Sequence, residues 1–255
     1  MGAWRALTTA LGLLLAWQLV VWASGAPPFI LPGPLAVARA LAARLTLILE
    51  HAAITAVEIV LGLIIGALLG SLSGLLLAAF RTARRWLLPL LVISQALPVF
   101  ALAPLLVLWL GYGLASKVAM AVLIIYFPVT AAFFDGLRRT DPGWLELARV
   151  MNAGRHAVLW HIRVPAALPA LASGLRVATS VAPIGAVVGE WVGSSAGLGF
   201  LMLHANARMQ ADLLFAALVV LAAMAVGLYF AVDRLLSRLV FWEPRDPGLG
   251  REDGA

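Results

Sequence analysis

Six long apolar runs dominate this sequence and decide what the chain can fold into. A helix needs about 20 apolar residues to cross the roughly 30 Å hydrocarbon layer of a membrane. Runs of that length, or close to it, lie at residues 7–24, 52–80, 87–110, 117–134, 168–192 and 213–235. We therefore predict an all-α polytopic membrane protein with about six transmembrane helices, forming one membrane domain over residues 1–255.

The composition agrees with lipid as the main solvent of the chain. Charged residues make up 12% of it, whereas a soluble domain carries about 25%. The net charge of +6 is scattered between the apolar runs, with no basic block longer than the stretch at 81–85, so nucleic-acid binding is not indicated. The chain has no cysteine, which excludes disulfides and thiolate metal sites.

The first apolar run has a second interpretation. Small residues at 23–25 suit signal-peptide cleavage, although the run is long for such a peptide and only Arg5 precedes it. Cleavage would remove one span without changing the orientation of the others, so both interpretations stay open.

The distribution of Lys and Arg predicts the orientation, because cytoplasmic loops carry the excess of these residues. With the N-terminus in the cytoplasm, the inner segments hold Arg5, Arg81, Arg84, Arg85, Arg138, Arg139, Arg149, Arg155, Arg163, Arg234, Arg238, Arg245 and Arg251. The outer segments hold Arg39, Arg44, Lys117 and Arg208, and Arg176 lies near a helix end. We predict that both termini and residues 135–167 are cytoplasmic, and that residues 33–50 form an amphipathic helix on the outer surface.

Glycine and proline mark special places within the predicted spans. Gly62, Gly66, Gly70 and Gly74 recur every four residues and share one helix face, where a neighbouring backbone can approach closely. That neighbour is either another helix of this chain or a second copy of it. Prolines interrupt the third to fifth spans, which favours helices that line a pathway. They are Pro89, Pro98, Pro104, Pro128, Pro169 and Pro183.

Ionisable residues inside the predicted spans are few, and they include Glu58 in the second and Glu190 near the outer end of the fifth. An intramembrane carboxylate is costly, so each needs a partner, a cavity or a proton. We interpret Glu58 as structural or as a contact to another helix. Glu190 leads into the glycine-rich WVGSSAGLGF, which is an outer gate, a re-entrant turn or an ordinary loop. The gate and pathway hypothesis covers Glu190, Gly193, Gly197, Gly199, Pro98 and Pro183.

Catalytic and metal-binding motifs give no coherent site. GSSAG at 193–197 matches the nucleophile-elbow pattern of hydrolases, but it lacks a strand–turn–helix context and His204 is the only histidine near Ser195. The four histidines lack metal-ligand spacing. No phosphate-binding loop is present, and Lys117 is the only lysine. We expect no metal, no cofactor and no enzymatic activity in this chain, and any ATP that drives it must bind another chain.

Residues 135–167 form a polar island between the fourth and fifth spans. Asp141 and Pro142 suit the cap and first turn of a helix, which WLELARVM continues with helical spacing. Residues 152–154 (Asn-Ala-Gly) then permit a sharp turn, because Asn and Gly tolerate left-handed backbone angles. The amphipathic RHAVLWHIRV leads back to the membrane. We predict a helix–turn–helix knob that can dock into a partner, with a plain cytoplasmic loop as the alternative.

This island resembles the cytoplasmic signature loop of permease subunits in ATP-binding-cassette (ABC) importers, in which E-A-A-x-x-x-G is followed by I-x-L-P. The present sequence reads Glu-Leu-Ala at 146–148, has Asn152 at the glycine position, and reads Ile-Arg-Val-Pro at 162–165. It departs from the pattern at Leu147, Asn152 and Val164, and Asn152 keeps the turn chemistry. The resemblance implies that the knob is the coupling helix that sits in a groove of the cytoplasmic ATPase. Its contacts would be Glu146, Leu147, Ala148, Asn152, Ala153 and Gly154.

The resemblance extends over nearly the whole chain. Residues 31–41, 96–113 and 168–178 look like the nitrate, sulfonate and taurine branch of these permeases. Residues 185–218 are similar to permeases for hydroxymethylpyrimidine, the pyrimidine precursor of thiamine. The resemblance implies a type I ABC importer permease fold in the bacterial inner membrane. It also implies a homodimer, two cytoplasmic ATPase subunits and an extracytoplasmic solute-binding protein, which work together by alternating access.

Several alternatives stay open at this point. The cargo could be a sulfonate, taurine, nitrate or a riboflavin-like molecule rather than a pyrimidine. A membrane receptor or scaffold would lack an ATPase in its complex, and a secondary transporter would not depend on ATP.

Overall fold

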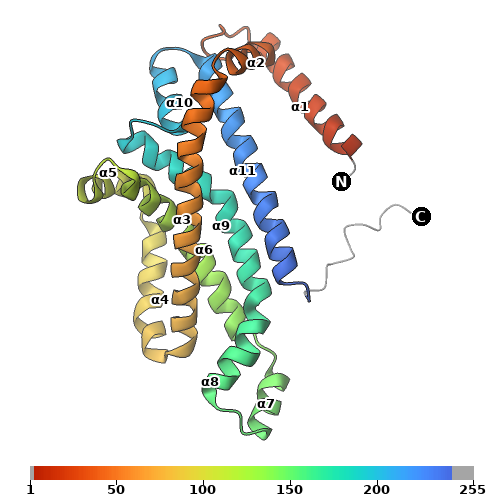
Figure 1. Ribbon diagram of the computed structural model, residues 1–255, viewed down its shortest axis with the longest axis vertical. Coiled ribbons are helices and arrows are strands. Elements are labelled where there is room, and N and C mark those ends of the chain that lie inside the picture. Colours follow the sequence, from red (N-terminus) through yellow and green to blue (C-terminus); the bar gives the residue numbers. More distant parts are fainter. Residues whose placement is uncertain (1–2, 243–255) are drawn as a thin grey trace. The chain divides into compact units, whose positions relative to one another are not determined.

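The computed structural model describes residues 3–242, and every regular element in that range is helical (Figure 1). The predicted all-α fold is therefore confirmed. The helices are α1 (Ala3–Ser24), α2 (Pro34–Ala43), α3 (Leu45–Ala79), α4 (Arg81–Ala96), α5 (Val99–Leu110), α6 (Leu114–Arg138), α7 (Pro142–Val150), α8 (Arg155–Val158), a π-helical turn η1 (Leu159–Arg163), α9 (Val164–Gly193), α10 (Leu198–Ala207) and α11 (Ala211–Leu239).

Five helical segments in the described part are long and apolar enough to cross a membrane, and a sixth span results if α4 and α5 are taken together. The third predicted span, 87–110, is not one helix, because the chain breaks at Leu97 and Pro98 between α4 and α5. The other prolines of the spans lie inside continuous helices. The exact limits of the spans in a bilayer remain a prediction.

Two further expectations need correction. The outer helix predicted over residues 33–50 is split at Arg44, because α2 ends at Ala43 and residues 45–50 already belong to α3. Between the last two predicted spans the chain forms α10, a short helix that the sequence patterns did not indicate. Its residues Leu198, Leu201 and Met202 are buried.

The chain divides into two compact units. The first comprises the chain up to Ile65 with Leu97–Ile124 and Val181–Gly227, and the second comprises Gly66–Ala96, Ile125–Ser180 and the chain from Leu228. Helices α3, α6, α9 and α11 contribute residues to both units. The single membrane domain therefore stays a prediction.

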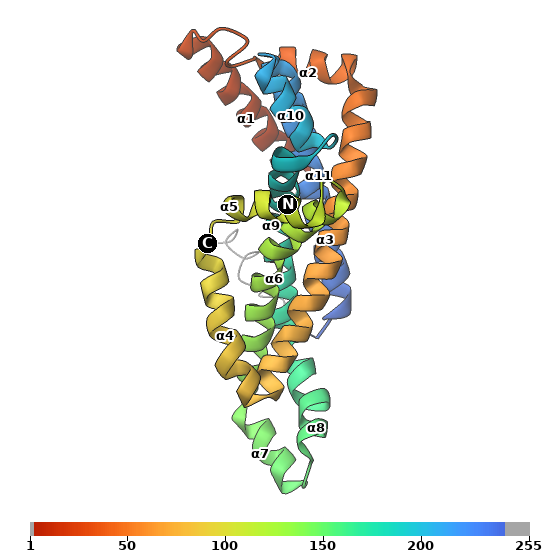
Figure 2. The ribbon, with the colours of Figure 1, turned by 90° about the vertical axis from the view of Figure 1, so that its left-hand side faces the viewer.

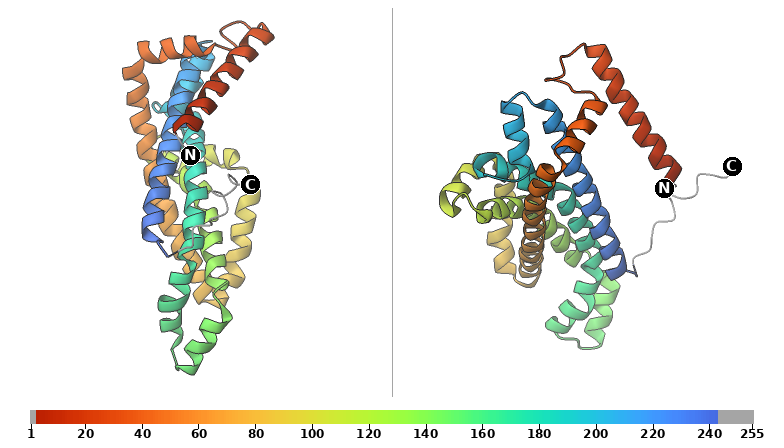
Figure 3. Two further views of the ribbon diagram at one scale, coloured as in Figure 1. Left: turned by 90° about the vertical axis from the view of Figure 1, so that its right-hand side faces the viewer. Right: turned by 45° about the horizontal axis from the view of Figure 1, so that its top comes forward.

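The core of the first unit joins α2, α3, α10 and α11 through buried residues such as Val37, Ile48, Leu201 and Ala216. Helix α1 takes little part in it. Figure 3 shows α1, in red, standing apart from α10 and α11 over most of its length, and none of its apolar window is buried. Its main anchor is Trp17, which stacks on Phe215 with 5.7 Å between ring centroids. Its remaining apolar surface must face lipid or another chain.

Glycines bring three helices of the first unit into very close contact. A β-carbon at Gly62 of α3 would lie 2.5 Å from the β-carbon of Ala121 of α6. A β-carbon at Gly185 of α9 would lie 2.7 Å from the Cα atom of the same alanine. Ala121 is thus held between two glycines, and no larger residue fits on either side.

The second unit repeats this arrangement. Gly70 and Gly74 of α3 face Val129 and Phe133 of α6, where a β-carbon would lie 2.9 and 3.2 Å from the nearest side-chain atom. On α9, a β-carbon at Gly174 would lie 2.6 Å from that of Ala132. Gly66, between these contacts in the sequence, is buried as well. The glycine stripe of α3 therefore lies inside the chain against α6.

An ion pair links α9 to α11 in the second unit. The Nε atom of Arg176 donates a hydrogen bond to Oδ1 of Asp233 at 2.7 Å, and both side chains are partly exposed. The pairing explains how an arginine can lie well inside an apolar helix rather than at its end.

We expect Gly62→Leu to destabilise the protein strongly, because the new side chain cannot fit between α3 and Ala121. Overpacking of this kind costs about 1–3 kcal/mol, and more where the backbone must shift. The matched control is Gly227→Leu on α11, because Gly227 has open space around it. Thermal unfolding of the two purified variants should separate them by several degrees, and equal melting temperatures would contradict the packing described here.

Candidate functional site

Helices α7 and α8 lie side by side as a hairpin (Figure 2), and the local sequence explains how α7 begins and ends. The Asp141 side chain caps α7 by accepting a hydrogen bond from the Gly143 amide at 2.6 Å, and Pro142 occupies the first turn. Both roles agree with the prediction. A capping carboxylate satisfies one of the free amides of the first turn and also suits the positive end of the helix dipole.

The turn after α7 is a Schellman motif centred on Asn152. Asn152 has a left-handed φ of 55°. Its amide donates to the Arg149 carbonyl, and the Ala153 amide donates to the Ala148 carbonyl, both at 2.9 Å. This pattern terminates a helix and normally requires glycine or asparagine at the left-handed position. Asn152 therefore performs the turn that the family pattern assigns to glycine, while Gly154 has an ordinary φ of −67°.

Most of the proposed contact residues of this hairpin are exposed. The exposed members are Glu146, Leu147, Asn152, Ala153 and Gly154. Ala148 is buried, with 3% of its surface exposed. Its side chain packs inside the hairpin and its carbonyl closes the turn, so Ala148 positions the neighbouring residues.

A second assembly, in the first unit, surrounds the start of α10. The first amides of a helix have no partner inside the helix. Here side chains from other helices accept hydrogen bonds from three amides at the start of α10. The Gly197 amide donates to Nδ1 of His51 at 2.9 Å, and the Leu198 amide donates to Oγ1 of Thr55 at 2.8 Å. The Gly199 amide donates to Oε2 of Glu190.

Glu190 connects this cap to α3. Its Oε1 atom accepts a hydrogen bond from the Thr55 hydroxyl at 2.6 Å, and only 1% of the residue is exposed. A carboxylate at a helix N-terminus is favoured by the amides and by the helix dipole. Gly197 and Gly199 pack so closely on the Glu190 carboxylate that a β-carbon at either position would collide with it, and Gly197 also has a φ of 109°. The glycine-rich segment is therefore a fitted cap around Glu190.

Two more ionisable side chains are buried next to this cap. Glu58 of α3 is 1% exposed, and its carboxyl group lies beside that of Glu190. Lys117 of α6 is 6% exposed and donates to the carbonyls of Tyr112 and Gly113 at 2.9 and 3.2 Å. It lies against Gly189 of α9. The sequence analysis counted Lys117 among the outer segments at the start of a predicted span, and the structure shows that its side chain is buried inside the first unit.

The other three residues of the gate hypothesis lie outside this cap and differ in how deeply they are buried in the protein. Gly193 packs against Val107 of α5, where a β-carbon would lie 2.6 Å from the valine side chain. Pro98 is exposed directly before α5, and Pro183 is buried inside α9. Of the six residues, the structure thus brings Glu190, Gly197 and Gly199 together at one point. Ser195 lies in the loop before α10, and Nδ1 of His204 lies 3.0 Å from the Phe200 carbonyl of its own helix, which gives no support to a hydrolase site.

Comparison with known proteins decides what kind of chain this is. Residues 62–241 match the family described as the inner membrane component of binding-protein-dependent transport systems. The chain belongs to this family. It is therefore the permease subunit of an ABC importer, a multi-pass membrane protein that works with an ATPase and a binding protein. This assignment replaces the receptor and scaffold alternatives.

Three relatives support the assignment over nearly the full length. A probable ABC transporter permease of Haemophilus influenzae is 58% identical over 90% of this chain and 94% of its own. The riboflavin transport permease RibX of Chloroflexus aurantiacus is 40% identical over 94% and 91%. The formylaminopyrimidine transport permease ThiX of Halalkalibacterium halodurans is 34% identical over 91% and 93%.

The fold agrees with a solved importer. The permease chain of the MetNI methionine ABC transporter, in an inward-facing conformation, superposes with a TM-score of 0.68 at 20% identity. The match covers 77% of this chain and 97% of that one. It supports the ABC importer permease fold and says nothing about cargo.

Sequence reasoning missed most of the permease's capping network. It considered Glu58 and Glu190 separately and counted His51 only among the four histidines that lack metal-ligand spacing. A signal was available, because His51, Thr55 and Glu58 are spaced four and three residues apart and so share one face of α3. What the sequence lacks is any sign that this face meets Glu190 and the start of α10.

Thr55→Val should loosen the start of α10, because valine has nearly the same shape but cannot hydrogen-bond. The Leu198 amide and Glu190 would each lose a partner, and an unsatisfied buried group costs about 1–3 kcal/mol. We expect hydrogen exchange at residues 198–199 to accelerate by roughly 30-fold. Thr46→Val, at an exposed position of the same helix, should leave this exchange unchanged. An unchanged rate in Thr55→Val would show that the cap does not depend on the hydroxyl.

Proposed function

We propose that this permease imports a small nitrogen heteroaromatic solute of the pyrimidine class, with hydroxymethylpyrimidine as the first candidate. The observation behind the proposal is the ThiX relative, whose name specifies formylaminopyrimidine and which aligns over 91% of this chain. Residues 185–218, which include Glu190 and α10, are the segment that resembles hydroxymethylpyrimidine permeases.

A riboflavin-like solute is the second candidate, because the RibX relative is 40% identical. The two candidates share chemistry, since riboflavin contains a fused pyrimidine ring. Sulfonates and taurine are a more distant class of anions without such a ring. Competition between these compounds therefore tests the class of cargo directly.

We propose that two copies of the chain enclose one translocation path. Both termini and the hairpin at 135–167 face the cytoplasm in this arrangement, in agreement with the excess of arginine in the inner segments. Arg245 and Arg251, which contribute to that excess, lie outside the described residues. Each hairpin docks on one ATPase subunit, and a solute-binding protein docks on the opposite side of the membrane.

The proposed cycle is alternating access. ATP binding closes the ATPase dimer and moves the docked hairpins together, which opens the path to the outside, and hydrolysis resets it. ATP and the loaded binding protein supply the differential interaction that any such population shift requires. The Glu190 cap of α10 acts at the outer gate, where it holds the segment at 193–199 in one conformation.

The first experiment measures uptake of labelled hydroxymethylpyrimidine in cells that lack this gene. Wild-type permease should restore uptake, and Glu146→Arg should reduce it at least tenfold, because a reversed charge opposes a complementary docking surface. Affinity-tagged Glu146→Arg should also recover less ATPase, while Glu50→Arg, at an exposed glutamate of α3, should recover as much as wild type. Unlabelled riboflavin and taurine serve as competitors.

The outcomes separate cargo from coupling. If wild type fails to restore uptake but still binds the ATPase, the pyrimidine assignment falls and riboflavin and sulfonates are tested next. If Glu146→Arg recovers a normal amount of ATPase, the hairpin is not the docking element that we propose.

Removal of the Glu190 carboxylate should impair the outer gate. We expect Glu190→Ala to lower uptake at least tenfold with normal ATPase recovery, because the Gly199 amide and the Thr55 hydroxyl both lose their acceptor. Asp212→Ala, at an exposed carboxylate near the start of α11, is the control. Wild-type uptake by Glu190→Ala would remove Glu190 from the transport cycle.

A further inference from the structure

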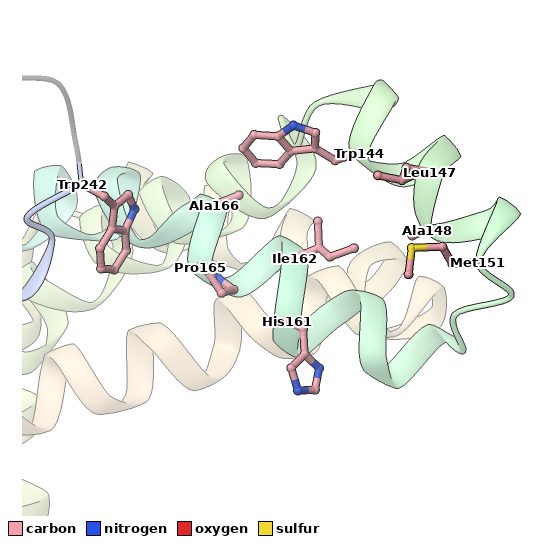
Figure 4. A pocket seen from close by; sticks show the side chains of 9 residues that line it. All are labelled: Trp144, Leu147, Ala148, Met151, His161, Ile162, Pro165, Ala166 and Trp242. Atoms are coloured by element: carbon pink, nitrogen blue, oxygen red, sulfur yellow. The ribbon is translucent and has the colours of Figure 1, made fainter.

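A cavity of about 370 Å³ opens beside the coupling hairpin (Figure 4). Trp144 and Leu147 of α7 and Met151, which caps its C-terminus, line it on one side, and Ile162 and Pro165 line it from the segment that follows the turn. Trp242, which follows the end of α11, completes the wall. The family motif does not include Trp144 or Trp242. We call this cavity the hairpin socket.

The apolar face of α7 extends the socket outward. Trp144, Leu147, Val150 and Met151 are between 55% and 79% exposed. Charged residues of the same hairpin, Glu146, Arg149 and Arg155, are exposed as well. A mixture of this kind belongs in water rather than in lipid, and four large apolar side chains on one short helix mark a surface that another protein covers.

We propose that the hairpin socket receives a large apolar side chain of the partner ATPase, and that Trp242 is part of the coupling interface. This inference rests on the proposed docking of the hairpin. The socket continues the exposed face of the signature helix, and its two tryptophans are of the residue type that most often dominates interface energy. The hairpin thus has two features that fit the ATPase. It projects into a groove of the ATPase, and its socket receives an ATPase side chain.

The remaining chain is poorly suited to fill the socket itself. Residues 243–255 read EPRDPGLGREDGA, in which Leu249 is the only large apolar residue. Six of these residues are acidic or basic, and the others are glycine, proline, Leu249 and Ala255. A segment of this composition cannot replace the contacts that a cavity lined by tryptophan, leucine and methionine offers.

Single cysteines can test the socket cleanly because the chain contains none. In Ala166→Cys the new thiol lies in the socket wall. We expect a maleimide reagent to label it in the purified permease and to label it at least tenfold more slowly in the assembled complex with the ATPase. Glu50→Cys, on exposed α3 surface, should react equally in both. A chain truncated after Trp242 should give the same protection.

Each other result overturns the socket proposal. Equal labelling of Ala166→Cys with and without ATPase shows that the ATPase does not enter the socket. Protection in the permease alone that disappears on truncation identifies the C-terminal segment as the occupant. Protection in the permease alone that survives truncation identifies a second copy of the chain.

Affinity measurements distinguish this proposal from the docking on which it rests. Trp242→Ala should weaken ATPase binding at least tenfold, as loss of a tryptophan hot spot does, while Trp86→Ala, at an exposed tryptophan of α4, should not. If Glu146→Arg abolishes binding and Trp242→Ala has no effect, the socket proposal fails and the docking hairpin stands. If neither variant changes binding, the docking hairpin itself fails.

Discussion

The close contact of α3 and α9 with α6 is the constraint on which the rest of this permease depends. In lipid, helices gain little from hiding apolar surface, so they associate through tight packing and polar contacts. Ala121 lies between Gly62 and Gly185, and similar glycine contacts recur in the second unit. Only such close contact brings the polar faces of α3 and α9 within hydrogen-bonding distance. Glu58 lies one turn of α3 before Gly62, and Gly189 and Glu190 lie one turn of α9 after Gly185. The close packing of the helices therefore brings the two buried carboxylates together.

Burial of Glu190 is costly unless donors surround it, and the structure supplies them from two directions. The Thr55 hydroxyl comes from α3, and the Gly199 amide comes from α10. The same contacts satisfy amides that the start of α10 would otherwise leave unpaired. The carboxylate therefore fixes the segment at 193–199 at one place, and the segment in turn satisfies the carboxylate. An arrangement in which each part needs the other changes as a unit, which is the behaviour that a gate requires.

Local patterns predicted much of this molecule. Apolar runs gave the helices, and Asp141, Pro142 and Asn152 predicted the ends of α7, because caps and left-handed turns depend on neighbouring residues alone. The sequence did not reveal which proline of the third span would break the helix. The chain breaks at Leu97 and Pro98, whereas α4 and α5 accommodate the prolines at 89 and 104. The cap of α10 could not be predicted from the sequence for a different reason. It joins His51, Thr55 and Glu190, and contacts between residues that lie far apart in the sequence leave no periodicity to detect.

Helix α9 is the element that relates the two proposed functional regions. One helical segment runs from Arg155 in the hairpin to Gly193 beyond Glu190. Pro165 has no amide to donate and its ring crowds the preceding turn, and the wider π-helical turn at Leu159–Arg163 precedes it. Such turns are frequent at functional sites. A register change there would alter the hairpin socket, which Ile162 and Pro165 line, without breaking the helix that presents Glu190. Coupling by this route requires two discrete arrangements of the π-helical turn, both of which must be populated in the transport cycle.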